Sequence, residues 1–117
     1  MFGGVNANAV VSQFIPPYLS GTTLITDASK GNAFSFIMDG DYTLALPTSP
    51  IRDGHFITWR FIQDGVGSRL LTLHANFDVG PFTVTLSTAT GAVDYLAAIY
   101  REYAGKWDIM GFNNGYA

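Results

Sequence analysis

Apolar and polar residues alternate along short segments of the chain after Thr22, and turn-forming residues separate these segments. Alternation places successive side chains on opposite faces of a strand, so the pattern predicts short β-strands. In the longest segment, His55–Gln63, the residues Ile57, Trp59 and Phe61 fall on one face, and the other face is also partly apolar. This is typical of a strand covered on both sides. The other predicted strands are Thr22–Asp27, Ala33–Met38, Asp41–Leu46, Arg69–His74, Thr83–Leu86, Asp94–Tyr103 and Lys106–Phe112.

Two short turns predict β-hairpins. The Asp39-Gly40 pair suits the left-handed backbone angles of a two-residue type I′ turn. In Asp94–Tyr103 the Ala and Glu residues favour helix, whereas the Tyr and Ile residues favour strand. Because only Ala104-Gly105 separates this segment from Lys106–Phe112, we predict that both segments are strands and form a hairpin. The predicted fold is therefore all-β, an antiparallel β-sandwich or jelly roll.

The first twenty residues carry no charged side chain and show neither strand nor helix periodicity. Gly3-Gly4 and Pro16-Pro17 predict an extended segment. We therefore expect an N-terminal arm over residues 1–20 and one β-domain over residues 21–117. The apolar side chains expected to bind a partner are Phe2, Val10, Val11, Phe14, Ile15, Tyr18 and Leu19.

Burying these side chains alone does not offset the conformational entropy lost when the arm becomes ordered. We therefore expect the arm to order against a partner that also supplies backbone hydrogen bonds, as in strand addition. The alternative is an arm that folds back on its own domain.

Composition points to a covered surface. The chain has 117 residues, of which 48% are hydrophobic and 13% charged, and the charged share is roughly half the usual one. A low charge is typical of surfaces that another protein covers, although a very apolar core is the alternative. The net charge is −3 and the six Lys and Arg residues are scattered, so a nucleic-acid partner is not expected. The apolar runs are too short for a membrane span.

Candidate catalytic chemistry is sparse. His55 and His74 lack a metal-ligand spacing, and the chain has no Cys, so we expect neither a metal nor a cofactor. Asp39, Asp53 and Asp64 precede Gly, where Asp favours turns by accepting bonds from its own backbone. Nothing singles out the paired carboxylates of a glycosidase. The remaining Asp residues, expected at strand ends or exposed strand positions, are Asp27, Asp41, Asp78, Asp94 and Asp108.

Aromatic residues make up 15% of the chain. Residues of this type are enriched in protein cores and in subunit interfaces, which is the interpretation we favour. The alternative is that some of them form a platform on which sugars stack. The residues considered for such a platform are Trp59, Trp107, Tyr95, Tyr100 and Tyr103.

Sequence pieces between about Asp27 and Phe112 resemble, in order and spacing, a domain of structural proteins in tailed bacteriophages. The resemblance implies a virion component and carries no catalytic residue. The pieces are Gly31-Asn32-Ala33-Phe34, Leu44-Ala45-Leu46-Pro47, Gly54-His55, Arg60-Phe61-Ile62-Gln63-Asp64, Gly67-Ser68-Arg69-Leu70-Leu71-Thr72, Leu86-Ser87-Thr88, Asp94-Tyr95-Leu96 and Lys106-Trp107-Asp108.

Similar domains occur in tail fibres and in small head proteins. A fibre tip would end a much longer chain with a shaft, and no shaft repeat is present. If Met1 and Ala117 are the ends of the product, its shortness favours a capsid cement, or decoration, protein. We then expect a homotrimer on the capsid surface that bridges major capsid protein subunits. The alternatives are a receptor- or glycan-binding tail component and, third, a glycan-cleaving enzyme.

Overall fold

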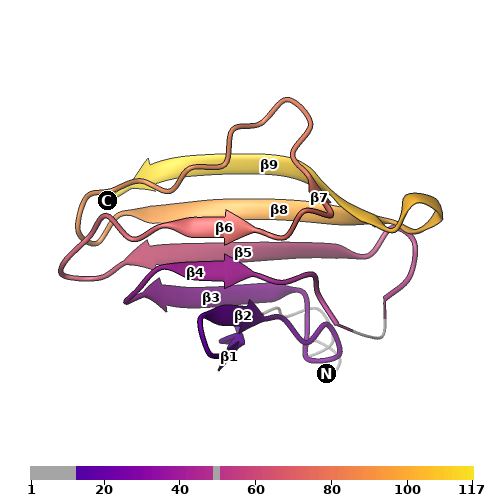
Figure 1. Ribbon diagram of the computed structural model, residues 1–117, viewed down its shortest axis with the longest axis horizontal. Helices are drawn as coiled ribbons and strands as arrows, with labels where there is room; N and C mark the ends of the chain where they lie inside the picture. The colour runs from indigo at the N-terminus through magenta and orange to yellow at the C-terminus, as the bar shows by residue number, and fades with distance from the viewer. Residues whose placement is uncertain (1–12, 49–50) are drawn as a thin grey trace, which may run out of the picture.

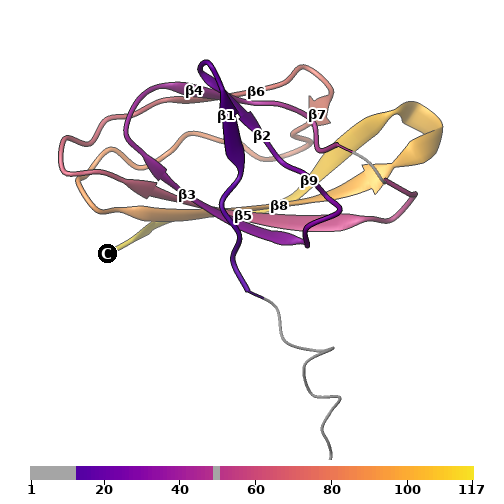
Figure 2. The same cartoon turned by 90° about the horizontal axis from the view of Figure 1, so that it is seen from below.

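The computed structural model describes residues 13–48 and 51–117 and shows two β-sheets that lie one over the other (Figures 1 and 2). One sheet has four strands in the order β1-β2-β4-β6, and the other has five in the order β3-β5-β8-β9-β7. The chain is mostly β, as predicted. The elements are β1 (Tyr18–Ser20), β2 (Thr23–Ile25), β3 (Ala33–Met38), β4 (Tyr42–Leu44), β5 (Phe56–Gln63), β6 (Leu71–Leu73), β7 (Phe77–Asp78), β8 (Val93–Arg101), the 3₁₀ turn η2 (Glu102–Ala104) and β9 (Lys106–Tyr116).

From β2 to β7 the chain winds alternately between the two sheets. Each time the chain returns to the same sheet, the new strand runs in the same direction as the previous strand of that sheet. The pairs β2–β4, β4–β6 and β3–β5 are therefore parallel, and β7 also pairs in parallel with β9. The pairs β1–β2, β5–β8 and β8–β9 are antiparallel. Both sheets are thus mixed, and the purely antiparallel arrangement is not confirmed.

The predicted hairpin at Asp39-Gly40 is wrong. Both flanking strands form, as β3 and β4, but they belong to different sheets. A type I′ turn needs positive φ at both central residues, and neither Asp39 nor Gly40 has one. This turn therefore carries the chain across the core instead of back along the same sheet.

The hairpin predicted at Ala104-Gly105 is confirmed. Strands β8 and β9 pair in antiparallel register, and η2 with Gly105 at a φ of 64° closes the turn. Gly tolerates this left-handed angle because it has no Cβ. The strand predicted over Thr83–Leu86 does not form, although Leu86 is buried, and the short strand β7 was not predicted.

The core lies between the two sheets. Ile57, Trp59 and Phe61 point inward from β5 and are buried, as the alternation predicts. The indole N–H of Trp59 donates to the hydroxyl of Thr26 at 2.9 Å. Both groups are buried, so this bond satisfies two polar atoms and ties β5 to the segment that follows β2 in the other sheet. The opposite face of β5 is only partly buried, with Phe56 exposed, so the predicted cover on both sides is not supplied by the described part of this chain.

The segment predicted as a free arm joins both sheets at its C-terminal end. Ile15 forms a parallel bridge with Phe34 of β3, and Tyr18–Ser20 forms β1. The expectation that all of residues 1–20 lies outside the sheets is therefore wrong at these positions, while residues 1–12 lie outside the described residues. The physical reason is that the outer edge of β3 carries backbone groups that need partners, and Ile15 supplies two of them.

Candidate protein-binding surfaces

Residues 13–20, here called the edge segment, run from the edge of the five-stranded sheet to the edge of the four-stranded sheet (Figure 2). The amide of Ile15 donates to the carbonyl of Ala33 at 2.9 Å, and the carbonyl of Ile15 accepts from the amide of Ser35 at 3.0 Å. The Ile15 side chain packs against the core. Gly31 makes room for it, because a Cβ there would lie 2.8 Å from Ile15 Cδ1.

Beyond the prolines, β1 presents large side chains to solvent. Tyr18 is 57% exposed and Leu19 is 46% exposed, although both are apolar enough to favour burial. Within the described residues β1 pairs with β2 alone, so its other edge carries backbone donors and acceptors without a strand partner. Such an edge is a template on which a strand from another chain can be added.

The predicted arm residues thus divide into three groups. Tyr18, Leu19 and Phe14 are exposed, the first two on β1 and Phe14 beside Arg60, whereas Ile15 is packed inward. Phe2, Val10 and Val11 lie outside the described residues. Binding of a partner by any of them stays a prediction.

A second apolar surface is the outer face of the five-stranded sheet, which no helix or further strand of the described residues covers (Figure 2). Register partners form rows across β3, β5, β8 and β9. The first outward-facing row is Ile37, Ile62, Val93 and Tyr116. The second row is Ser35, Arg60, Tyr95 and Asn113, and the third is Ala33, Thr58, Ala97 and Gly111.

The single charge at the centre of these rows is partnered within the chain. The Nε of Arg60 donates to the hydroxyl of Ser35 at 2.9 Å, and its guanidinium carbon lies 4.0 Å from the centroid of the Phe14 ring. This cation–π contact brings the start of the edge segment onto the outer face. The outer face of the five-stranded sheet and the edge segment therefore adjoin at Phe14.

The outer face of the four-stranded sheet is more polar along its centre. Its central row of register partners consists of hydroxyl side chains, namely Ser20, Thr23, Thr43 and Thr72. Hydroxyls on an outward face suit contact with water. The two sheets therefore differ in one outward row each: the four-stranded sheet has a hydroxyl row, which lies beside Tyr18 and its register partner Ile25, and the five-stranded sheet has an apolar row, which lies beside the row that contains Arg60.

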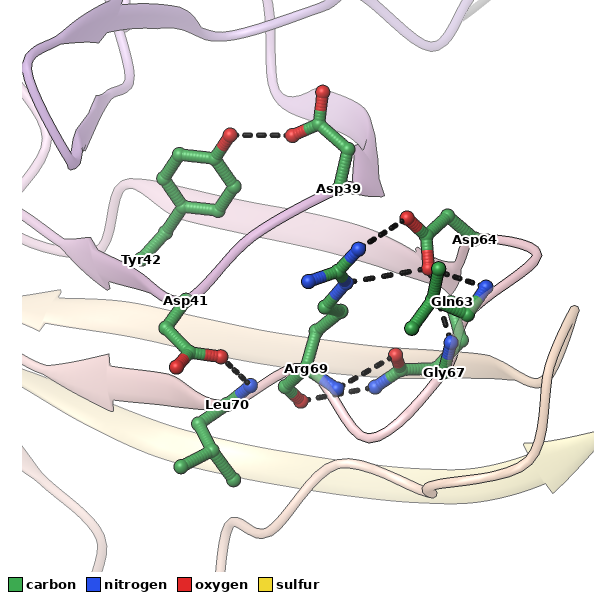
Figure 3. Close-up of polar contacts among 9 residues, drawn as sticks. Asp39, Asp41, Tyr42, Gln63, Asp64, Gly67, Arg69 and Leu70 are labelled. Carbon is green, nitrogen blue, oxygen red and sulfur yellow. Dashed lines mark hydrogen bonds and ion pairs between the residues drawn. The ribbon is translucent and has the colours of Figure 1, made fainter.

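Polar contacts hold the loop after β5 in place (Figure 3). The buried side-chain amide of Gln63 makes two hydrogen bonds to the backbone of Arg69. Its NH₂ group donates to the Arg69 carbonyl, and its oxygen accepts from the Arg69 N–H, both at 3.0 Å. Asp64 accepts from the amides of Val66 and Gly67 at 3.0 Å and pairs with Arg69 at 2.9 Å. The Arg69 guanidinium and these backbone amides lower the pKa of Asp64 to about 2. Of the three Asp residues before Gly, Asp64 confirms the predicted backbone turn.

The neighbouring acids tie different segments together. The carboxylate of Asp41 accepts from the amide of Leu70 at 2.9 Å, and Asp39 accepts from the Tyr42 hydroxyl (Figure 3). The hydrogen bond to Asp39 raises the pKa of Tyr42. Asp53-Gly54 does form the predicted turn, which the His55 N–H closes by donating to the Arg52 carbonyl at 3.0 Å. The Asp53 carboxylate, however, accepts from the backbone amide of Glu102 and not from its own turn, so the predicted bond to the local backbone is not found at Asp53, nor at Asp39.

Asp94 is far more buried than the sequence predicts. It was expected at a strand end or an exposed strand position, but only 1% of the residue is exposed. Its carboxylate accepts from the amide and hydroxyl of Ser87 at 2.7 and 2.9 Å and from the amide of Gly115 at 2.9 Å. These bonds hold the end of β9 beside β8, where the rings of Tyr95 and Tyr116 meet edge to face at 5.5 Å. No local sequence signal reveals such long-range partners.

In comparisons with protein-family models, curated proteins and solved structures, the chain gave no significant match.

One pair of carboxylates does converge, on Arg101 of β8. Its guanidinium lies 2.8 Å from Asp108 and 3.2 Å from Asp78. Arg101 lowers the pKa of Asp108, whereas the acid of a glycosidase pair needs a raised pKa. The arrangement is that of an ion-pair bridge between strands. Among residues 13–48 and 51–117, no three His, Cys, Asp or Glu side chains gather into a group that could hold a metal.

The aromatic residues considered for sugar stacking are divided by burial. Trp59 and Trp107 are buried and belong to the core. Tyr103 is 86% exposed at the tip of the β8–β9 hairpin, with the Arg101 guanidinium 5.6 Å from its ring centroid. His74 accepts from the amide of Asn76 at 3.0 Å, so its imidazole takes part in the turn that follows β6. None of the described helical turns is long and apolar enough to cross a membrane.

Proposed function

We propose that this chain is a non-enzymatic virion structural protein, namely a capsid cement or decoration protein of a tailed bacteriophage. On this proposal it is a β-sandwich module that binds the major capsid protein on the outside of the head and bridges neighbouring subunits. The ordered series of sequence pieces that resembles phage structural proteins supports the class of protein. The low share of charged residues supports a surface that is covered in the assembly.

One observation carries the proposal: the edge segment presents exposed apolar side chains on a strand whose outer edge has no partner in the described residues. Tyr18 and Leu19 supply apolar contact area, and the free edge of β1 supplies backbone hydrogen bonds. This is the combination that strand addition requires. Several copies held on one shell would act together, so weak single contacts give firm attachment.

Binding to heads that lack the protein tests the proposal. The double variant Tyr18→Ser with Leu19→Ser should bind at least about tenfold more weakly, because two apolar side chains would no longer be buried. The matched control is Tyr103→Ser with Val66→Ser, which also removes one exposed Tyr and one exposed aliphatic side chain. The control should bind within about twofold of the unaltered protein. Equal binding by both double variants would overturn the assigned surface.

The second candidate is a receptor- or glycan-binding tail component, and the exposure of Tyr103 favours it. Copy number separates the two candidates, because a cement protein is present on every face of the shell and a tail component in few copies. Densitometry of purified particles on a stained gel gives that ratio. A few copies per particle, together with loss of glycan binding in the Tyr103→Ser variant, would favour the tail role.

A further inference from the structure

The outer face of the five-stranded sheet has a size and composition that solvent alone does not explain. Ile37 is 59% exposed, and the row that it begins continues through Ile62 and Val93 to Tyr116 without a charged side chain. Sheets that face water usually alternate apolar and polar positions, with polar residues outward. The hydroxyl row of the four-stranded sheet follows this rule, and the apolar row of the five-stranded sheet does not.

We infer that a second copy of this chain covers the outer face of the five-stranded sheet. The occupant follows first from area. Strands β3, β5, β8 and β9 have 6, 8, 9 and 11 residues, which at about 3.3 Å per residue and 4.8 Å between strands gives a flat footprint of roughly 500 Å². Protruding side chains add accessible area to this footprint. The face is therefore of the order that specific complexes bury, about 800 Å² on each partner.

Charge also favours a copy of the same chain. The central cation, Arg60, is already held by Ser35 and by the Phe14 ring. At the far end of the sheet, Arg101 is paired with Asp108. Lys106, the register partner of Arg101, lies at the same end. Charge is therefore concentrated at that end of the face, and two such faces can meet along the apolar row and the row of small side chains without placing unpaired like charges together.

Shape supports packing of sheet against sheet. The third row consists of small side chains, and a Cβ added at Gly111 would meet no heavy atom within 4 Å. Large side chains of a facing sheet can settle into such a row beside the apolar row. Two sheets of the same twist pack well face to face, as the sheets of β-sandwiches do. This inference concerns self-association and does not depend on the capsid role.

Substitution of Ala97 tests the inference, because Ala97 lies in the third row with Thr58 and Gly111 as its register partners. If this outer face is in contact with water, an Arg side chain at position 97 is tolerated. If a second copy packs its sheet against the face, the Arg side chain prevents that contact. The matched control is Thr43→Arg, at the centre of the outward row of the other sheet. Ile37→Lys is the second test variant, because its exposed site leaves the fold of one chain undisturbed.

Molar mass by light scattering after size exclusion gives the result. At a protomer concentration of about 50 µM, the unaltered chain and Thr43→Arg should have the mass of two chains, because a face that packs against its own copy is used up in a dimer. Ala97→Arg and Ile37→Lys should raise the dissociation constant by at least about tenfold. A monomeric unaltered chain would overturn the inference. So would an oligomer that survives both test variants, or one that Thr43→Arg disrupts. Head binding by the Tyr18 and Leu19 variant reports separately on the proposed function.

Discussion

Asp94 provides the sharpest test of how this fold is held together. In Asp94→Asn the side chain keeps its shape, but one carboxylate oxygen becomes an NH₂ group. The carboxylate accepts from two backbone amides, those of Ser87 and Gly115, through different oxygens. Whichever way the new amide turns, its NH₂ group therefore faces one backbone N–H. An unsatisfied donor at a nearly buried site costs about 1–3 kcal/mol, and loss of charge assistance adds to this.

The expected loss in the free energy of unfolding is therefore about 2–4 kcal/mol. Urea unfolding followed by the fluorescence of the buried Trp59 and Trp107 measures it. With a typical m-value for a small domain, the midpoint should fall by about 1–2 M urea.

The matched control is Asp41→Asn, whose carboxylate accepts one hydrogen bond, from Leu70, at an exposed site. It should lose only about 0.5–1 kcal/mol. A loss in Asp94→Asn no larger than that of the control would refute the assignment of Asp94 as the clamp on the end of β9.

Two further outcomes follow from the loop after β5. Gly67→Ala should lose at least about 2 kcal/mol in the same urea assay, because Gly67 has a φ of +79° and a new Cβ would lie 2.6 Å from a backbone oxygen. Gly65→Ala, in open space and without a positive φ, should change stability by less than about 0.5 kcal/mol; equal losses would contradict the loop geometry. The pKa of Asp64 is lowered to about 2 in the folded state, so its stabilising contribution is present above about pH 4 and is lost as pH falls toward 2. The advantage of the unaltered chain over Asp64→Asn in urea midpoint should therefore shrink between pH 4 and pH 2, and a constant advantage across that window would disprove the role of the Arg69 pair.

The sequence determined which segments become strands wherever local pattern and turn chemistry agreed. Alternation in His55–Gln63 predicted the buried face of β5, and Ala104-Gly105 predicted the β8–β9 hairpin. Both features depend on residues close together in the chain, where backbone preference and side-chain direction decide the outcome. The Asp64 turn was predictable for the same reason, since its acceptor and donors lie within three residues.

Only the tertiary structure decided which strands are neighbours and which faces stay uncovered. Asp39-Gly40 suits a hairpin by composition, yet the chain crosses the core there and produces parallel neighbours in both sheets. The burial of Asp94 and the apolar row from Ile37 to Tyr116 depend on partners far apart in sequence. Strand pairing is a property of the whole fold, because each strand fits several partners locally and only the packed core selects among them.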